Sequence, residues 1–148
     1  MDDRTHDERC IPGVIDCALR ILAPDDPNTR LTLIHMDFSA FDDDINVKDA
    51  DQGLWDAEPM VYKELGLEDP INLESKTDIL VGGAPAVKRI FSELLLKNNK
   101  VIGTLYVERV LIVYQKQTFH FYLNTTVKSK FAGYQELMEQ IIETFVFK

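Results

Sequence analysis

Three runs rich in apolar and β-branched residues follow one another between residues 86 and 126, and two short polar turns join them. The first turn contains Asn98 and Asn99, and asparagine tolerates the positive φ that tight hairpins require. The second turn is the polar tripeptide at 115–117. Because runs joined by such short turns fold back beside each other, the pattern predicts an antiparallel meander with strands at 86–97, 101–114 and 118–126.

The first run of this meander is locally ambiguous. Its apolar residues have the spacing of one helix face, which by itself predicts an amphipathic helix: Val87, Ile90, Phe91, Leu94 and Leu95. The hairpin turn and the β-branched run that follow favour a strand instead. We therefore predict a strand over 86–97.

Alternating apolar and polar residues predict three further strands, at about 14–22, 30–38 and 72–81. The strand at 30–38 has apolar side chains on both faces, so we expect it to lie inside the sheet with both faces covered. The strand at 72–81 has charged residues on one face and is expected to be half exposed. A Gly-Gly-Ala-Pro turn at 82–85 ends it.

An apolar stripe of helical period occupies the end of the chain, from about 129 to 145. Its members are Phe131, Tyr134, Leu137, Met138, Ile141, Ile142 and Phe145. The 148 residues are the length of one domain. We predict a charged tail at 1–12 and one α+β domain at 13–148, in which helices flank an antiparallel sheet of about six strands and the last helix packs on the sheet.

The segment between residues 39 and 70 is acidic and irregular, with a short helix expected from Trp55 to Leu65. Gly66 is expected to end this helix in a left-handed conformation. Val61 and Leu65 lie one turn apart and are expected to face inward. Trp55 is expected to anchor the segment to the sheet, because an indole left in water would waste a large apolar area.

The formal charge of −9 is unevenly distributed, with −12 in residues 1–70 and +3 in residues 71–148. Nucleic-acid binding needs a basic surface that releases counterions from phosphates, so this distribution argues against DNA or RNA partners. The remaining electrostatic partners are cations and basic protein surfaces. A purely solubilising role for the acidic half is the alternative.

A calcium site is the most specific chemical hypothesis. Asp42, Asp44 and Asn46 present oxygen ligands at alternating positions, as calcium loops do. The EF-hand pattern is nonetheless incomplete, because Val47 and Gly53 stand where its glycine and its bidentate glutamate are required. No other cofactor is expected.

The same stretch suggests a contact with a basic protein. Asp42, Asp43 and Asp44, together with the aromatic Trp55, could anchor a cationic surface, as in acidic adaptors and immunity proteins.

No catalytic motif supports an enzyme. A G-x-S-x-G elbow, a phosphate loop and zinc-spaced histidines or cysteines are all missing from the sequence. His6, His35 and His120 are scattered along it, and Cys10 and Cys17 leave the redox compartment open. The alternative is an enzyme whose site gathers dispersed carboxylates around His35 or His120.

We find no pattern of a secretory signal within this sequence. No apolar run in it is long enough to cross a bilayer, so we expect no membrane span.

The second half resembles the PsbP-like group, which includes the extrinsic subunit of photosystem II, DcrB-type proteins and Mog-type Ran binders. The resemblance covers residues 71–148 and rests on the strand end and turn at 81–86, Arg109 in the middle strand, the aromatic run at 119–122 and the helix end at 141–147. It implies an α/β/α sandwich and a non-enzymatic binding, assembly or accessory role. It also implies an extracytoplasmic location if a leader has been removed, and it transfers no functional residue.

Overall fold

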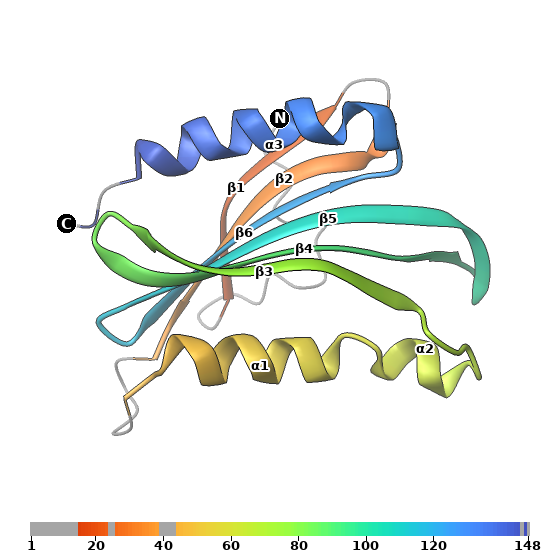
Figure 1. The fold of residues 1–148 in the computed structure, drawn as a ribbon, viewed down its shortest axis with the longest axis horizontal. Coiled ribbons are helices and arrows are strands. Elements are labelled where there is room, and N and C mark those ends of the chain that lie inside the picture. Colours follow the sequence, from red (N-terminus) through yellow and green to blue (C-terminus); the bar gives the residue numbers. More distant parts are fainter. Residues whose placement is uncertain (1–14, 24–25, 39–43, 146, 148) are drawn as a thin grey trace.

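The computed structural model describes residues 15–23, 26–38, 44–145 and 147, with side chains from Thr29 onward. One antiparallel sheet of six strands dominates it, in the order β1-β2-β6-β5-β4-β3 (Figure 1). The elements in chain order are β1 (Ile15–Ala23), β2 (Asp26–Asp37), α1 (Val47–Ala57), α2 (Met60–Glu64), β3 (Ile71–Val81), β4 (Ala84–Lys97), β5 (Lys100–Tyr114), β6 (Gln117–Thr125) and α3 (Lys128–Glu143).

The meander predicted from the polar turns is confirmed, including a strand at 86–97, which is the body of β4. Asn98 and Asn99 close the first hairpin with φ values of 51° and 62°. Gln115 and Lys116 close the second with 48° and 60°. The helical spacing of apolar residues in β4 arises because this strand buries side chains on both faces, since a strand covered on both sides loses strict alternation.

Strand β2 joins the first hairpin to the meander. It pairs with β1 on one side and with β6 on the other, so the predicted interior position is confirmed. Leu31 and Ile34 are both buried, and they face opposite sides of the sheet because they lie three positions apart along a strand whose side chains alternate.

The helices cover both faces of the sheet. Helix α3 lies across one face, whereas α1 and α2 lie across the other (Figure 1). The predicted packing of the C-terminal helix on the sheet is confirmed by its buried side chains Phe131 and Met138. Leu137, predicted to belong to the apolar stripe, is instead 49% exposed. The core on the α3 side contains Leu31, Val110, Ile112, Phe121 and Leu123.

The prediction of one helix from Trp55 to Leu65 is wrong. Helix α1 begins earlier, at Val47, and ends at Ala57, while α2 is a separate short helix from Met60 to Glu64. Pro59 stands between them, and its ring nitrogen has no hydrogen with which to continue the α1 ladder. Gly66, with φ of 74°, has the predicted left-handed conformation.

The predicted inward face of this segment is also wrong. Val61 is 54% exposed and Leu65 is 36% exposed, whereas Tyr62 is the buried residue of α2. The new helix start at Met60 sets the rotation of α2, and this rotation turns Tyr62 towards the sheet. Among the described helices, none is both long and apolar enough to cross a bilayer.

Candidate functional site

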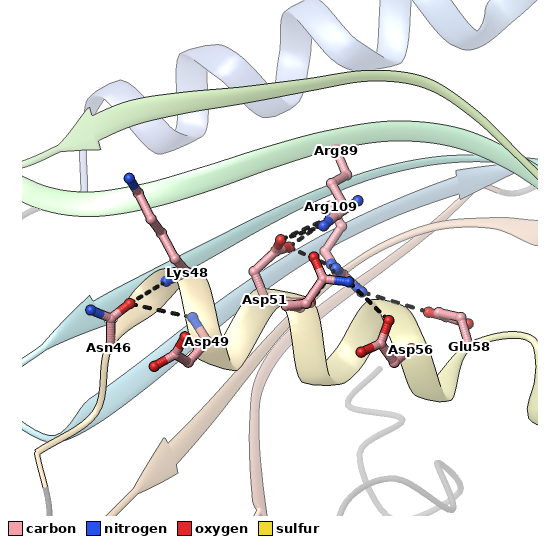
Figure 2. Close-up of polar contacts among 9 residues, drawn as sticks. Asn46, Lys48, Asp49, Asp51, Asp56, Glu58, Arg89 and Arg109 are labelled. Atoms are coloured by element: carbon pink, nitrogen blue, oxygen red, sulfur yellow. Dashed lines mark hydrogen bonds and ion pairs between the residues drawn. The ribbon is translucent and has the colours of Figure 1, made fainter.

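The acidic stretch of the sequence begins helix α1. Asn46 is its N-cap, and the side-chain Oδ1 accepts hydrogen bonds from the backbone N–H groups of Lys48 at 2.8 Å and Asp49 at 3.3 Å (Figure 2). The cap satisfies two donors that the first helical turn leaves free. With the helix starting here, Asp51 faces the sheet while Asp56 stays exposed.

Asp51 is fully buried between two arginines of the sheet (Figure 2). Arg89 of β4 donates from Nε to both carboxylate oxygens at 2.9 Å and from Nη2 to Oδ2 at 2.7 Å. Arg109 of β5 donates from Nη2 to Oδ1 at 2.8 Å. Burial disfavours the charged carboxylate, but the hydrogen bonds from Arg89 and Arg109 outweigh it and hold the pKa of Asp51 below its ordinary value.

A second carboxylate group adjoins these arginines. Arg109 Nη1 lies 3.8 Å from Glu58 Oε1 at the end of α1. Burial, followed by the negative charge of Glu58, raises the pKa of Glu93 to about 7. Tyr62 donates from its hydroxyl to the carbonyl oxygen of Leu94 at 2.8 Å, and burial raises the pKa of that hydroxyl.

Trp55 completes the contact between α1 and the sheet. Its ring meets Phe91 edge to face with centroids 5.2 Å apart, and the Arg89 guanidinium carbon lies 4.5 Å from the indole centroid. The predicted anchoring of Trp55 to the sheet is therefore confirmed. Its predicted role in holding a basic partner stays a prediction.

The cluster around Asp51 is a structural clamp that fastens α1 and α2 to β4 and β5. Its charges compensate one another, and its central side chains are closed to solvent. Asp51 belongs to the segment at 39–70 that was predicted to be acidic and irregular, and no buried ion pair was predicted there. Arg89 and Arg109 carried the missed signal, since each is a charged residue inside an apolar strand and must have a buried partner.

The predicted calcium and partner residues are placed only in part. Asp42 and Asp43 lie outside the described residues, and Asp44 is exposed. The oxygen of Asn46 that was expected to bind calcium caps α1 instead. Within the described part of the chain, no three His, Cys, Asp or Glu side chains gather closely enough to hold a metal ion.

The two described histidines lie on opposite faces of the sheet, because each follows the alternation of its strand. His35 stacks on Phe119 with centroids 4.7 Å apart, and its Nε2 is 2.8 Å from Gln117 Oε1. His120 is buried on the α1 side, where its Nε2 is 3.2 Å from Thr118 Oγ1. Burial, followed by the positive charge of Arg109, lowers the pKa of His120 to about 4. His6 lies outside the described residues.

His120 lines an apolar pocket of about 360 Å³ between α1 and strands β2, β5 and β6. Asp49 is the one acid among the described residues that line it. The site predicted for the enzyme alternative, with several carboxylates around a histidine, is therefore not assembled by the described residues here.

A larger groove lies between α3 and the β3–β4 side of the sheet, with a volume of about 600 Å³. We call it the α3 groove. It exists because α3 packs on β6 and β5 and leaves the neighbouring strands of that face uncovered. Its floor includes Ile79, Val81, Lys88, Ile90, Glu108 and Val110. Its wall on α3 includes Ala132, Gln135, Glu136, Glu139, Ile142 and Glu143.

The α3 groove combines a mostly apolar floor, which also holds Lys88 and Glu108, with a wall of carboxylates. Glu136, Glu139 and Glu143 are exposed along α3, and Lys88 is the one basic residue among the described lining residues. The prediction for the last helix concerned its apolar stripe and assigned no role to these glutamates. The groove itself depends on where α3 rests across the sheet, and this position has no local signal.

The fold and these contacts define an α+β protein with a single sheet covered on both faces by helices. No protein-family model matches the chain, and no curated protein matches it. A solved structure is similar: a Pseudomonas aeruginosa protein of unknown function that has been suggested to be a regulator. It shares 17% sequence identity with a TM-score of 0.59, over 95% of this chain and 88% of that one. At this identity, the likeness shows a shared fold alone.

Proposed function

We propose that this protein is a non-enzymatic binding or accessory protein, and that it holds a partner protein in the α3 groove. The observation that carries the proposal is the groove itself, an open recess of about 600 Å³ whose floor is mostly apolar and whose wall is charged. Apolar area gives contact energy and a polar rim gives orientation, which is the usual division within a protein interface.

The remaining polar chemistry of the fold supports a binding role. Asp51 and the two arginines that hold it are engaged in the clamp, and His35 and His120 are separated by the thickness of the sheet. The resemblance to the PsbP-like group implies the same kind of role.

Site-specific photo-crosslinking tests the proposal. A photoreactive residue replaces exposed Glu139 in the groove, and the control variant carries it at exposed Glu74 of β3, outside the groove. Both proteins are irradiated in extract of the source cells. We expect one discrete crosslinked partner from position 139 and none of that product from position 74. No discrete product at 139, or the same products from both positions, would overturn the proposal.

A further inference from the structure

The charge of the α3 groove runs against the composition of the sequence around it. Residues 71–148 have a formal charge of +3, yet the groove they form is lined by four acids and one lysine. The acids are Glu108, Glu136, Glu139 and Glu143. The acidity of this recess is therefore a local arrangement and does not follow from the average charge of the segment.

The most buried of these acids is Glu108, which lies on the floor of the groove. Glu108 is 4% exposed, and its Oε1 accepts one hydrogen bond, from Gln135 Nε2 at 3.2 Å. Among the described residues Glu108 forms no ion pair within 4.0 Å, although the positive charge of Lys88 acts on its carboxylate. A carboxylate can accept about four hydrogen bonds, and one of these comes from a described side chain. Burial raises the pKa of Glu108 above its ordinary value, against the opposing effects of the Gln135 hydrogen bond and the Lys88 charge.

The acids are spread along the groove and do not converge on one point. No three of the described acids are close enough together to share a metal ion. Charges spaced along a wall fit a ligand whose positive groups are also spaced. Half-buried Ile79 and Ile90 lie below them and offer apolar contact to the same ligand.

We infer that the α3 groove binds a basic, amphipathic segment of the partner protein, whose apolar side chains lie on the floor while lysine or arginine side chains meet the glutamates of α3 and reach Glu108. This inference rests on the proposed function and adds the chemistry of the partner to it. Apolar contact supplies affinity here, and the paired charges supply selectivity.

Three synthetic peptides of equal length test this chemistry. One combines leucine and lysine at helical spacing, the second replaces lysine with glutamate, and the third replaces leucine with serine. Fluorescence anisotropy with the full chain at 50 mM salt should give the tightest Kd for the leucine–lysine peptide. The other two should bind at least about tenfold more weakly, which corresponds to about 1.4 kcal/mol. Equal binding of the leucine–glutamate peptide would overturn the inference.

Charge-matched variants locate the binding. Glu136→Lys with Glu139→Lys reverses two exposed charges in the groove, and Glu64→Lys with Glu74→Lys reverses two exposed charges elsewhere. We expect the first pair to raise the Kd of the leucine–lysine peptide at least about tenfold and the second to raise it less than about threefold. Equal effects of the two pairs would show nonspecific attraction and contradict the inference. Circular dichroism verifies that both variants fold.

The crosslinking experiment separates this inference from the function on which it rests. Mass spectrometry of the product formed at position 139 identifies the partner peptide that occupies the groove. A peptide without lysine or arginine would overturn the basic-segment inference and leave the proposed function standing. Absence of a specific product would overturn the proposed function.

Discussion

Asp51 of α1 and Arg89 of β4, which lie 38 positions apart in the sequence, form a two-point ion pair at 2.7 Å and 2.9 Å. Neither side chain has more than 3% of its surface exposed. The same carboxylate accepts a hydrogen bond from Arg109 of β5, so one helical aspartate connects two neighbouring strands. This arrangement fixes both the position and the rotation of α1 over the sheet.

Replacing Asp51→Asn should lower the free energy of unfolding by about 3–5 kcal/mol, because it leaves buried Arg89 without its counter-ion and buried Arg109 with only the more distant Glu58. Urea unfolding followed by circular dichroism measures the change. The matched control is Asp56→Asn, an exposed change on the same helix, with an expected effect below about 0.5 kcal/mol.

Removing the charges of Asp51, Arg89 and Arg109 together tests whether the loss of stability comes from unpaired buried charge. If Asp51→Leu is combined with Arg89→Met and Arg109→Met, we expect most of the lost stability to return, since apolar residues of similar volume avoid the desolvation cost. A triple variant no more stable than Asp51→Asn would contradict this explanation. If Asp51→Asn does not fold, a folded triple variant would still support this explanation.

Glu93 should make stability fall as pH rises. Its folded-state pKa of about 7 lies above its ordinary value of 4.5, so between these values the folded protein keeps a proton that the unfolded chain has released. The Glu93 contribution to the free energy of unfolding therefore decreases from pH 4.5 to pH 7 and is constant above that range. The difference between the wild-type protein and Glu93→Gln, from urea unfolding at each pH, should follow this curve. A difference that is flat from pH 5 to pH 8 would refute the assignment, and Glu74→Gln provides the exposed control.

His120 should have the opposite effect. Its folded-state pKa of about 4 lies below its ordinary value of 6.5, so the unfolded chain takes up a proton in this window that the folded protein does not. The His120 contribution to stability is complete above pH 6.5 and is lost as pH falls towards 4. NMR titration of the imidazole protons should give a midpoint near 4. A midpoint at 6 or above would mean that the ring is hydrated and that the buried placement is wrong.

Alanine substitutions at the two adjacent glycines of the β3–β4 turn distinguish the cost of backbone strain from the cost of side-chain crowding. Gly82 and Gly83 both have positive φ, of 56° and 82°. A Cβ at Gly82 would lie 3.1 Å from the Phe147 ring, whereas a Cβ at Gly83 would meet no atom within 4 Å. Gly83→Ala should cost about 1 kcal/mol from strain, and Gly82→Ala should cost about 1 kcal/mol more from the clash. Thermal unfolding measures both.

A double variant tests whether the Phe147 ring causes the extra cost of Gly82→Ala. Combining Gly82→Ala with Phe147→Ala removes the ring that the new methyl group meets. In a double-mutant cycle, the two substitutions should then be coupled by about 1 kcal/mol. Additive effects would show that Phe147 does not crowd this glycine.

Local sequence determined the sheet and its covering helix. The period of two along β3, the asparagines at 98 and 99, and the 3.6-residue stripe of α3 are properties of neighbouring residues, and neighbouring residues set backbone conformation and turn geometry. The strand at 86–97 could not be predicted from its own residues, because only the turn and the run that follow it distinguished it from a helix. The resemblance to the PsbP-like group stays a prediction.

Tertiary structure decided the rest. Composition cannot tell which aspartate of an acidic stretch will meet Arg89 and Arg109, since the choice depends on packing between segments 38 and 58 residues apart. The same holds for Tyr62, which is buried in place of Val61 because the break at Pro59 resets the helix rotation. The α3 groove likewise arises from where one helix rests on a six-stranded sheet, because a recess is made by elements that meet only after folding.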